Sequence, residues 1–383
     1  MKKFVELIKR VHQERFSVVI NKILAEKIPV AFLSIAPFEN AVATVQNLRQ
    51  QGLNITNLVT IFPPPPPDFQ TDFSLTPLNE ISKIHPRPEF VLTDDKMWEM
   101  SSSRVAVKYI PKARVICLGG GDSEFVYQMF MNHLPELMEV YASLIDEESR
   151  RTFCGYWLGR ISYQVREFVY SRSAHYLIDG FIPEPGAVVI DGGVFDGGTA
   201  KVFTEMGYKV YGFEMDVKNF EISRKVAESK GFVVENFSLG SYRHKMRYNS
   251  VGGSGNSWNT GGADITQVVT LDEYVRENNL PRVDFIKLDV EGAELDILKG
   301  ARTCIARFKP ILAISAYHKL DDFWMLMDFI KSIRHDYEFA MRQGAETREE
   351  EPSNISEEFE DYLYSLGLEP ERRTCGECVL FAR

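Results

Sequence analysis

The sequence predicts an α/β protein whose C-terminal part contains a mostly parallel sheet and whose N-terminal part is a smaller α/β domain. Residues 187–190 form a continuous apolar run, as expected of a strand buried on both faces of a parallel sheet. Glycines follow this run, and a helical pattern resumes at Thr199. Apolar runs of strand length then alternate with helical segments, which is typical of repeated βαβ units.

The glycine-rich turn predicts a nucleotide-binding corner at the start of a Rossmann-like sheet. Glycine adopts positive φ without strain and lets a ligand approach the backbone closely. The order Asp191-x-Gly193-x-x-x-Gly197 differs from the G-x-G-x-x-G of dinucleotide sites and is the spacing of enzymes that use S-adenosylmethionine (SAM). Residues 208–213 are predicted to form the next strand, and Glu214 at its end is placed to accept hydrogen bonds from ribose hydroxyls.

A second pattern, at residues 283–301, consists of a strand, the sequence Asp-x-Glu-Gly and a helix that ends in Lys-Gly-Ala. This pattern resembles the signature of the FkbM family of SAM-dependent methyltransferases. Residues 269–274 and 311–319 resemble further segments of that family, in the family's order. The resemblance extends from about Tyr170 to the last residues of the sequence.

The resemblance implies a class I methyltransferase sheet, Rossmann-like and mostly parallel, closed by an antiparallel C-terminal hairpin. Residues 359–364 and 377–382 are the expected strands of that hairpin. We therefore expect three segments along the chain. They are a degenerate Rossmann-like α/β domain at residues 1–130, a helical linker at 131–169 and a methyltransferase domain at 170–383.

The resemblance also implies how SAM would be bound. Gly192 and Gly193 would lie against its methionine part, with Asp196 near its ammonium group. Glu214 would accept hydrogen bonds from its ribose. The full set of expected SAM-binding residues is Asp191, Gly192, Gly193, Phe195, Asp196, Gly197, Glu214, Met215, Ser238, Leu239, Asp289 and Tyr176.

Three polar residues near the predicted strand ends are candidates for catalysis. An acceptor hydroxyl is a poor nucleophile and profits from a positioned base. His318 is the expected base, because the ordinary pKa of histidine lies near physiological pH. Asp289 and Glu291 would orient it. The same three residues suggest an alternative in which they bind Mg²⁺ or Mn²⁺, so the sequence leaves a general base and a metal site both open.

The activity implied by the resemblance is O-methylation of a hydroxyl on a sugar, a glycan or a secondary metabolite, with SAM as methyl donor. An alternative is a non-catalytic subunit that binds SAM or a nucleotide sugar. A homo-oligomer formed through the N-terminal domain is a further expectation. Residues 250–262, rich in Gly, Ser and Asn, are expected to form either a mobile lid or a disordered loop.

The N-terminal half has the pattern of a βαβ domain without a nucleotide-binding turn. Its predicted strands lie at residues 29–35, 55–62, 90–93 and 114–118. The turn at 35–39 has no glycine, so we expect this domain to bind no nucleotide. The five prolines at 63–67 predict an extended surface connector. Residues 132–166 are predicted to be helical, with a break at 146–151.

Composition limits the classes of function. Hydrophobic residues make up 44% and charged residues 26% of the 383 residues, which is ordinary for a globular protein. A formal net charge of −10 argues against nucleic acid as a partner. No apolar run approaches the ~20 residues of a membrane span, and the first residues lack the apolar core of a signal peptide. The five cysteines are scattered, so we expect a reducing, cytoplasmic location.

Overall fold

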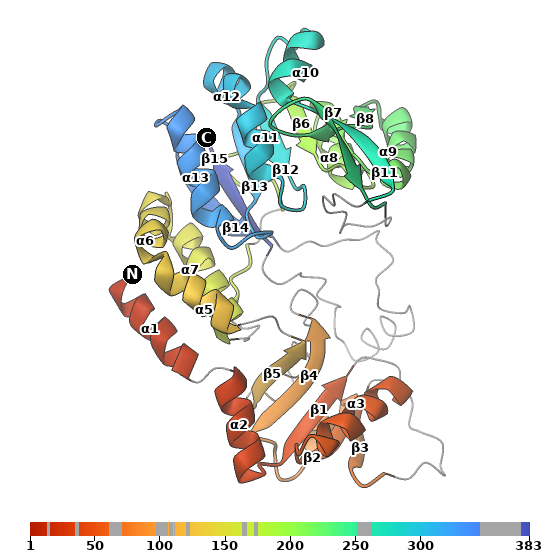
Figure 1. Cartoon of the computed structure of the whole chain (residues 1–383), viewed down its shortest axis with the longest axis vertical. Coiled ribbons are helices and arrows are strands. Elements are labelled where there is room, and N and C mark those ends of the chain that lie inside the picture. Colours follow the sequence, from red (N-terminus) through yellow and green to blue (C-terminus); the bar gives the residue numbers. More distant parts are fainter. Residues whose placement is uncertain are drawn as a thin grey trace. The chain divides into compact units, whose positions relative to one another are not determined.

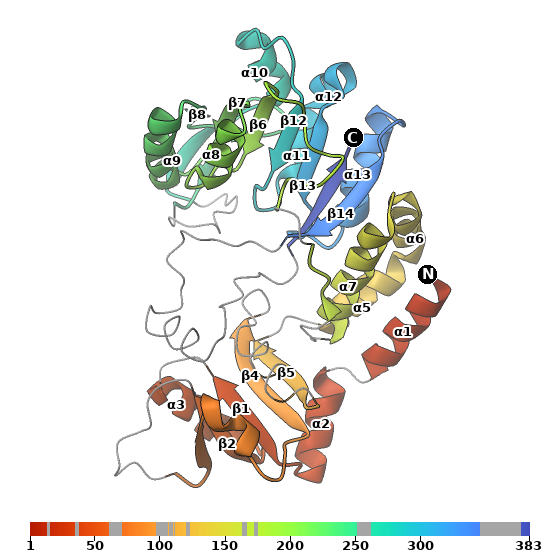
Figure 2. The ribbon, with the colours of Figure 1, turned by 180° about the vertical axis from the view of Figure 1, so that it is seen from behind.

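The computed structural model contains two compact units, which are described separately (Figures 1 and 2). It describes residues 1–13, 16–34, 38–60, 71–96, 106, 110, 112–119, 123–162, 167–171, 175–250, 262–344 and 377–383. Within these residues, the N-terminal unit comprises Met1–His133 and Arg151–Tyr170. The C-terminal unit comprises Leu134–Arg150, Ser171–Gly344 and Glu377–Arg383. The three-segment division expected from the sequence stays a prediction.

The N-terminal unit is built on a five-stranded parallel sheet with the order β3-β2-β1-β4-β5. Its elements are α1 (Lys2–Gln13), α2 (Phe16–Glu26), β1 (Val30–Ser34), α3 (Phe38–Gln50), β2 (Ile55–Thr60), β3 (Ser74–Pro77), η1 (Leu78–Lys83), β4 (Phe90–Lys96), β5 (Arg114–Gly119) and α5 (Ser123–Asn132). All four strands predicted from apolar runs are present. β3 was not predicted, because an edge strand that is polar and ends in proline lacks the apolar signal.

The order of the strands along the chain reverses between β1 and β4. From β1 the chain adds β2 and β3 on one side, and it then returns to add β4 and β5 on the other side. Ligands of open parallel sheets bind at such a reversal, beyond the carboxyl ends of the strands. Here the Ser34 hydroxyl at the end of β1 donates to the Asp94 carboxylate of β4 across 2.5 Å. The turn at 35–37 and the prolines at 63–67 lie outside the described residues, so the expectation that this domain binds no nucleotide stays a prediction.

The C-terminal unit contains a seven-stranded sheet with the order β14-β15-β13-β12-β6-β7-β8. Its elements are α6 (Leu134–Ser143), the start of α7 (Glu147–Ser162), β6 (Val188–Gly192), α8 (Gly198–Glu205), β7 (Lys209–Phe213), α9 (Val217–Lys230), β8 (Val233–Glu235), β9 (Ser238–Leu239), β10 (His244–Tyr248), β11 (Asp264–Val269), α10 (Leu271–Glu277), β12 (Phe285–Leu288), α11 (Glu294–Gly300), α12 (Arg302–Phe308), β13 (Ile311–Ser315), α13 (Asp322–Ile333), β14 (Phe339–Gln343) and β15 (Cys378–Ala382).

Every strand of this sheet runs parallel to its neighbours except β15, which is antiparallel to both β13 and β14. The order and directions are those of a Rossmann-like methyltransferase sheet, so the predicted fold class is confirmed. Helices α8 and α9 pack on one another, and so do α10 to α13. The two groups cover opposite faces of the sheet (Figures 1 and 2).

Of the two strands predicted for the C-terminal hairpin, the one at residues 377–382 is confirmed as β15. β15 forms where expected, but its two edges are occupied by β13 and β14. The expected partner, residues 359–364, lies outside the described part of the chain. The true neighbour, β14, precedes them in the sequence.

The predicted helix break at 146–151 is correct only at its first residue, since residues 144–146 are not helical and α7 already begins at Glu147. The Asp146 carboxylate accepts a hydrogen bond from the Ser149 N–H across 2.7 Å, and α7 begins at Glu147. An Asp that accepts from the third residue of a helix is an N-cap, so the acidic run begins the helix. The Arg342 side chain of β14 binds the Asp146 carboxylate at 2.8 Å and the Ser149 hydroxyl at 2.6 Å, which links this helix start to the sheet.

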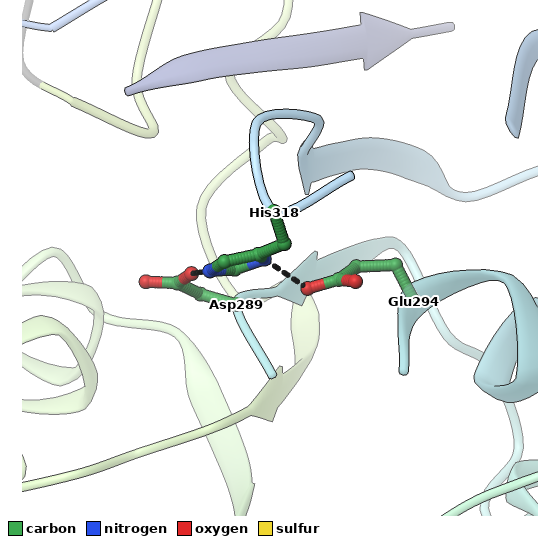
Figure 3. Close-up of side chains that lie close together, drawn as sticks. All are labelled: Asp289, Glu294 and His318. Atoms are coloured by element: carbon green, nitrogen blue, oxygen red, sulfur yellow. Dashed lines mark hydrogen bonds and ion pairs between the residues drawn. The ribbon is translucent and has the colours of Figure 1, made fainter. Parts of the chain in front are cut away.

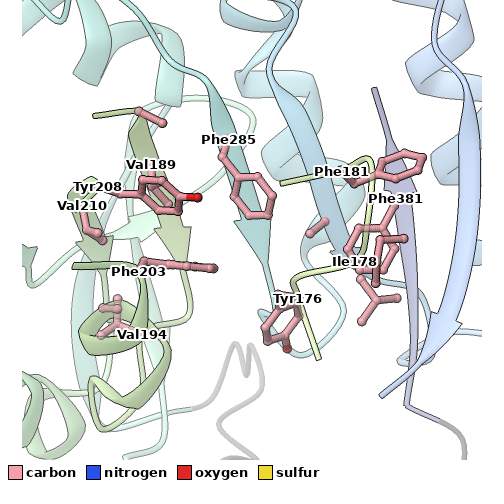
Figure 4. Close-up of a cluster of buried hydrophobic side chains, with 14 of the residues drawn as sticks. Tyr176, Ile178, Phe181, Val189, Val194, Phe203, Tyr208, Val210, Phe285 and Phe381 are labelled. Carbon is pink, nitrogen blue, oxygen red and sulfur yellow. The ribbon is translucent and has the colours of Figure 1, made fainter. Parts of the chain in front are cut away.

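One hydrophobic cluster of the C-terminal unit lies between the sheet and the α8/α9 layer and continues under the segment that precedes β6 (Figure 4). Phe203 of α8 meets Phe285 of β12 edge to face, with ring centroids 5.5 Å apart. Phe181 meets Phe381 of β15 in the same way at 5.9 Å. Burying a Phe side chain is worth about 1.5–3 kcal/mol, so these contacts help fix the strands whose ends form the site.

Candidate active site

The site is built from the carboxyl ends of three neighbouring strands, β12, β6 and β7. Asp191 of β6 is in register with Lys287 of β12 on one side and with Gly212 of β7 on the other. Sequence order reverses between β6 and β12, and open α/β sheets bind ligands at such a point. The sequence-predicted residues Asp191, Glu214 and Asp289 therefore meet at one edge of the sheet.

Gly193 allows the turn after β6 to lie directly against the turn after β12. Its φ is +79°, and a Cβ built at this position would be 1.9 Å from the Asp289 carbonyl oxygen. No other residue type fits that space. Phe195, in the same turn, also has positive φ, at +54°. The Asp196 carboxylate accepts from the Gly198 N–H at the start of α8 across 2.8 Å.

Glu214 holds this turn in place. Its carboxylate accepts hydrogen bonds from the Phe195 N–H at 2.9 Å and the Asp216 N–H at 2.8 Å. Burial raises the pKa of Glu214 to about 7, against the effect of these two donors. A carboxylate has about four lone-pair positions, so two remain free for hydroxyl donors. Glu214 can therefore fix the turn and accept from a ribose at the same time.

A buried ion pair joins β6 to β12. The Lys287 ammonium lies 3.0 Å from the Asp191 carboxylate and donates to the Gly193 carbonyl at 2.6 Å. Burial acts to lower the pKa of Lys287, but the carboxylates of Asp191 and Asp289 raise it above its ordinary value. Lys287 is therefore a charged ammonium. Asp191 is fully buried, so it supports the turn through this pair.

Asp289, the first residue after β12, accepts one tyrosine hydrogen bond on each of its two carboxylate oxygens. Its carboxylate accepts from the Tyr176 hydroxyl at 2.9 Å and from the Tyr317 hydroxyl at 3.2 Å. Although burial opposes it, the charges of Lys287 and His318 and the Tyr176 hydrogen bond lower the pKa of Asp289 to about 2. Asp289 is thus a permanent anion that orients two tyrosines.

His318 lies between carboxylates (Figure 3). Its Nδ1 is 2.8 Å from a Glu294 oxygen, and its Nε2 is 3.5 Å from oxygens of both Asp289 and Glu291. Burial would lower the pKa of His318, but the Glu294 hydrogen bond and the three carboxylate charges raise it to about 9. At neutral pH the ring is therefore an imidazolium. This protonation state does not favour the general-base role expected from the sequence.

The residues that approach a metal-binding geometry differ from the set expected from the sequence. Within the described part of the chain, Asp289, Glu294 and His318 offer ligand atoms within 4.8 Å of one another. Their carboxylates, however, face opposite nitrogens of the imidazole (Figure 3). A metal requires ligand atoms aimed at one central ion. The arrangement favours a hydrogen-bonded chain of carboxylate, imidazolium and carboxylate.

The remaining expected SAM-binding residues lie around the turn. Met215 is half-buried and follows Glu214, and Ser238 and Leu239 are buried in β9. A Cβ built on Gly192 would be 3.7 Å from the Leu239 side chain, so β9 borders the turn. Residues 251–261 of the expected lid lie outside the described residues.

Three residues of the cluster were missed by the sequence reasoning: Lys287, Glu294 and Tyr317. A signal existed for Lys287, because a lysine inside an apolar strand must be paired with an anion. Glu294 gave no signal of that kind, since a glutamate in the first turn of a helix is ordinary. Tyr317 gave no separate signal, because a tyrosine next to a strand end is ordinary and its hydrogen bond to Asp289 is visible only in the structure.

Comparisons with known proteins agree with this architecture. Residues 198–341 match the family model described as the methyltransferase FkbM domain. The crystal structure of methyltransferase FkbM from Methylobacillus flagellatus is 16% identical, with a TM-score of 0.64, and the match covers 99% of each chain. The C-terminal unit is therefore a methyltransferase unit. More particularly, residues 198–341 form a methyltransferase domain of the FkbM family.

Two other solved structures have lower similarity. An rRNA methylase from Streptococcus thermophilus is 13% identical, with a TM-score of 0.30, and covers 52% of this chain and 87% of its own. Fibrillarin from Aeropyrum pernix, solved with natively bound SAM, is 15% identical, with a TM-score of 0.28, and covers 55% and 71%. No curated protein matches the sequence. None of the helices described has the length and apolar character needed to cross a membrane.

Proposed function

We propose that this protein transfers the methyl group of SAM to a hydroxyl of a sugar, a glycan or a secondary metabolite. The observation that carries the proposal is the position of the polar cluster. Asp289, Glu291 and His318 lie at the end of β12 and just past β13, next to the Gly193 turn on β6. A cofactor on the turn and an acceptor at the cluster would be neighbours.

SAM fits the chemistry of the turn. Glu214 has free lone pairs for ribose hydroxyls, and Gly193 lets the turn that Glu214 holds lie directly against the turn that carries Asp289. SAM supplies an electrophilic methyl group, so the protein needs only to bind and orient the two reactants and to remove the hydroxyl proton. The ionisable cluster supports a hydroxyl acceptor, because an alcohol needs a base to become a good nucleophile.

Isothermal calorimetry with S-adenosylhomocysteine (SAH) tests the cofactor. We expect micromolar binding by the full chain and at least tenfold weaker binding by Glu214→Gln, whose amide N–H₂ would face a backbone N–H. Glu228→Gln, an exposed change on α9, is the matched control and should bind like the wild type. Absence of SAH binding together with tight binding of NAD would overturn the assignment.

The acceptor class is tested separately. Purified protein is incubated with methyl-tritiated SAM and a panel of nucleoside diphosphate sugars, methyl glycosides and polyhydroxylated small molecules. We expect label in at least one hydroxyl compound and none in amine or thiol analogues of the same size. SAH binding with transfer to amines alone would contradict the hydroxyl class and leave the cofactor assignment standing.

A further inference from the structure

We propose that Glu291 is the proton acceptor of the reaction and that His318 is a positioning residue, held between Glu291 and Glu294. This assignment rests on the proposed methyl transfer and names the base for it. It replaces the role expected for His318 from the sequence.

The backbone of Glu291 is held in a conformation that glutamate rarely adopts. Its φ is +56°, and the next residue, Gly292, has φ +96°. A non-glycine residue in the left-handed region costs about 1–2 kcal/mol, and such strain clusters at functional sites. Glycine at position 291 would remove the strain, so the side chain is the reason to keep a glutamate here.

The turn places the Glu291 carboxylate where an acceptor can reach it. The Glu291 side chain is 36% exposed, whereas the side chains of His318 and Glu294 are 9% and 0% exposed. The Asp289 side chain is also partly exposed, but two tyrosine hydroxyls occupy its oxygens. In this cluster, Glu291 is thus the most exposed carboxylate, at 36% against 28% for Asp289 and 0% for Glu294.

The protonation states agree with this geometry. Burial raises the pKa of Glu291 to about 7, with His318 acting to lower it and Asp289 and Glu294 acting to raise it. A base is most effective when its pKa is near the working pH. His318, with a pKa of about 9, already holds its proton, and Asp289, with a pKa of about 2, is too weak a base.

The proposed step balances as a displacement. The hydroxyl oxygen forms a bond to the methyl carbon of SAM while the carbon–sulfur bond breaks and its electron pair stays on sulfur. The hydroxyl proton passes to Glu291, whose carboxylate becomes neutral. The His318 imidazolium stabilises the Glu291 anion beforehand and, through Glu294 at Nδ1, is kept in one orientation.

The first experiment needs no acceptor. Side-chain NMR titrations of the full-length SAH complex should show one glutamate carboxyl with a pKa near 7 that is absent in Glu291→Gln. They should also show His318 protonated on both nitrogens at pH 7. A neutral His318 at pH 7, or no glutamate signal that disappears in Glu291→Gln, overturns the assignment.

The second experiment measures turnover on a hydroxyl acceptor found in the panel. Glu291→Gln should lower kcat by roughly 10²–10⁴-fold with unchanged SAH affinity, and Glu228→Gln should leave kcat unchanged. His318→Asn should retain the acidic limb of the pH–rate profile and move it to higher pH, because the imidazolium lowers the pKa of Glu291.

The results for the two variants and for SAH binding can be distinguished from one another. If His318→Asn removes the acidic limb and Glu291→Gln keeps it, histidine is the base and our assignment is wrong. Full activity of Glu291→Gln also overturns it. Failure of the wild type to bind SAH contradicts the proposed function itself, and calorimetry on the same samples separates that failure from this one.

Discussion

Substitution of Gly193 is predicted to affect both SAH binding and stability. Gly193→Ala places a methyl group where the Asp289 carbonyl oxygen lies, so the turns after β6 and β12 must separate. We expect SAH binding to be lost and the free energy of unfolding to fall by about 3 kcal/mol or more, the size of a severe core defect. Chemical denaturation and calorimetry measure the two effects.

Gly207→Ala is the matched control for this prediction. Gly207 has a similar φ of +85°, but a Cβ there would meet nothing within 4 Å. The variant should lose about 1 kcal/mol from backbone strain alone and bind SAH normally. Equal losses in the two variants would show that the contact with Asp289 is unimportant.

The stabilisation that His318 contributes is predicted to depend on pH. Its pKa is raised from 6.5 to about 9 in the folded protein, so folding is favoured by the bound proton. The stabilisation, on the order of 3 kcal/mol, is fully present below pH 6.5 and is lost as the pH rises to about 9. The difference in unfolding free energy between wild type and His318→Asn should therefore shrink over that range.

At the element scale, the start of α9 is linked to the site. The Asp216 carboxylate caps this helix by accepting from Lys218 N–H and Asn219 N–H, while its own N–H donates to Glu214. Asp216→Ala should cost about 1 kcal/mol of stability and also weaken SAH binding, because Glu214 loses its fixed neighbour. Thr270→Ala removes the cap of α10 and should cost a similar amount without weakening SAH binding. Equal SAH affinities in the two variants would contradict the link.

The elements that the sequence predicted are those with a strong local signal. β6, β7, β12 and β13 are apolar runs buried on both faces, and a parallel sheet requires that pattern. The pairing of β15 was not predictable in the same way. Which strand lies beside β15 depends on contacts between distant segments. The sequence of β14 predicts a strand but does not indicate which strand it pairs with.

The candidate site also has a part that local sequence signals predict and a part that they do not. Asp191, Gly193, Glu214 and Asp289 follow strands in motif spacing, so their meeting at one sheet edge could be predicted. The charge state of His318 could not, because it depends on Glu294, which reaches the ring from α11. The spacing of residues in the sequence predicts which of them lie near a strand end. It does not predict the protonation states of those residues, which depend on their neighbours in space.

At the scale of the whole molecule, the division into two compact units predicts two unfolding transitions. A ligand that binds one folded unit stabilises that unit by RT ln(1 + [L]/Kd), about 2.7 kcal/mol at a hundredfold excess over Kd. SAH should therefore raise the midpoint of one calorimetric transition and leave the other unchanged. A single transition, or an equal shift of both, would mean that the units unfold together.

The position of β15 between β13 and β14 has a consequence for biosynthesis. Both flanking strands are synthesised before β15, so the edge that each presents to β15 is unpaired until β15 is added. The sheet can close only after the whole segment has emerged, and slow long-range pairing leaves time for aggregation. In refolding followed by pulsed hydrogen exchange, the β13 amides that donate to β15 and the amides of β14 should gain protection together with β15, whereas the β13 amides that donate to β12 can be protected earlier. Phe381→Asp should delay the first group, and early protection of those amides in that variant would show that this edge of β13 finds another partner first.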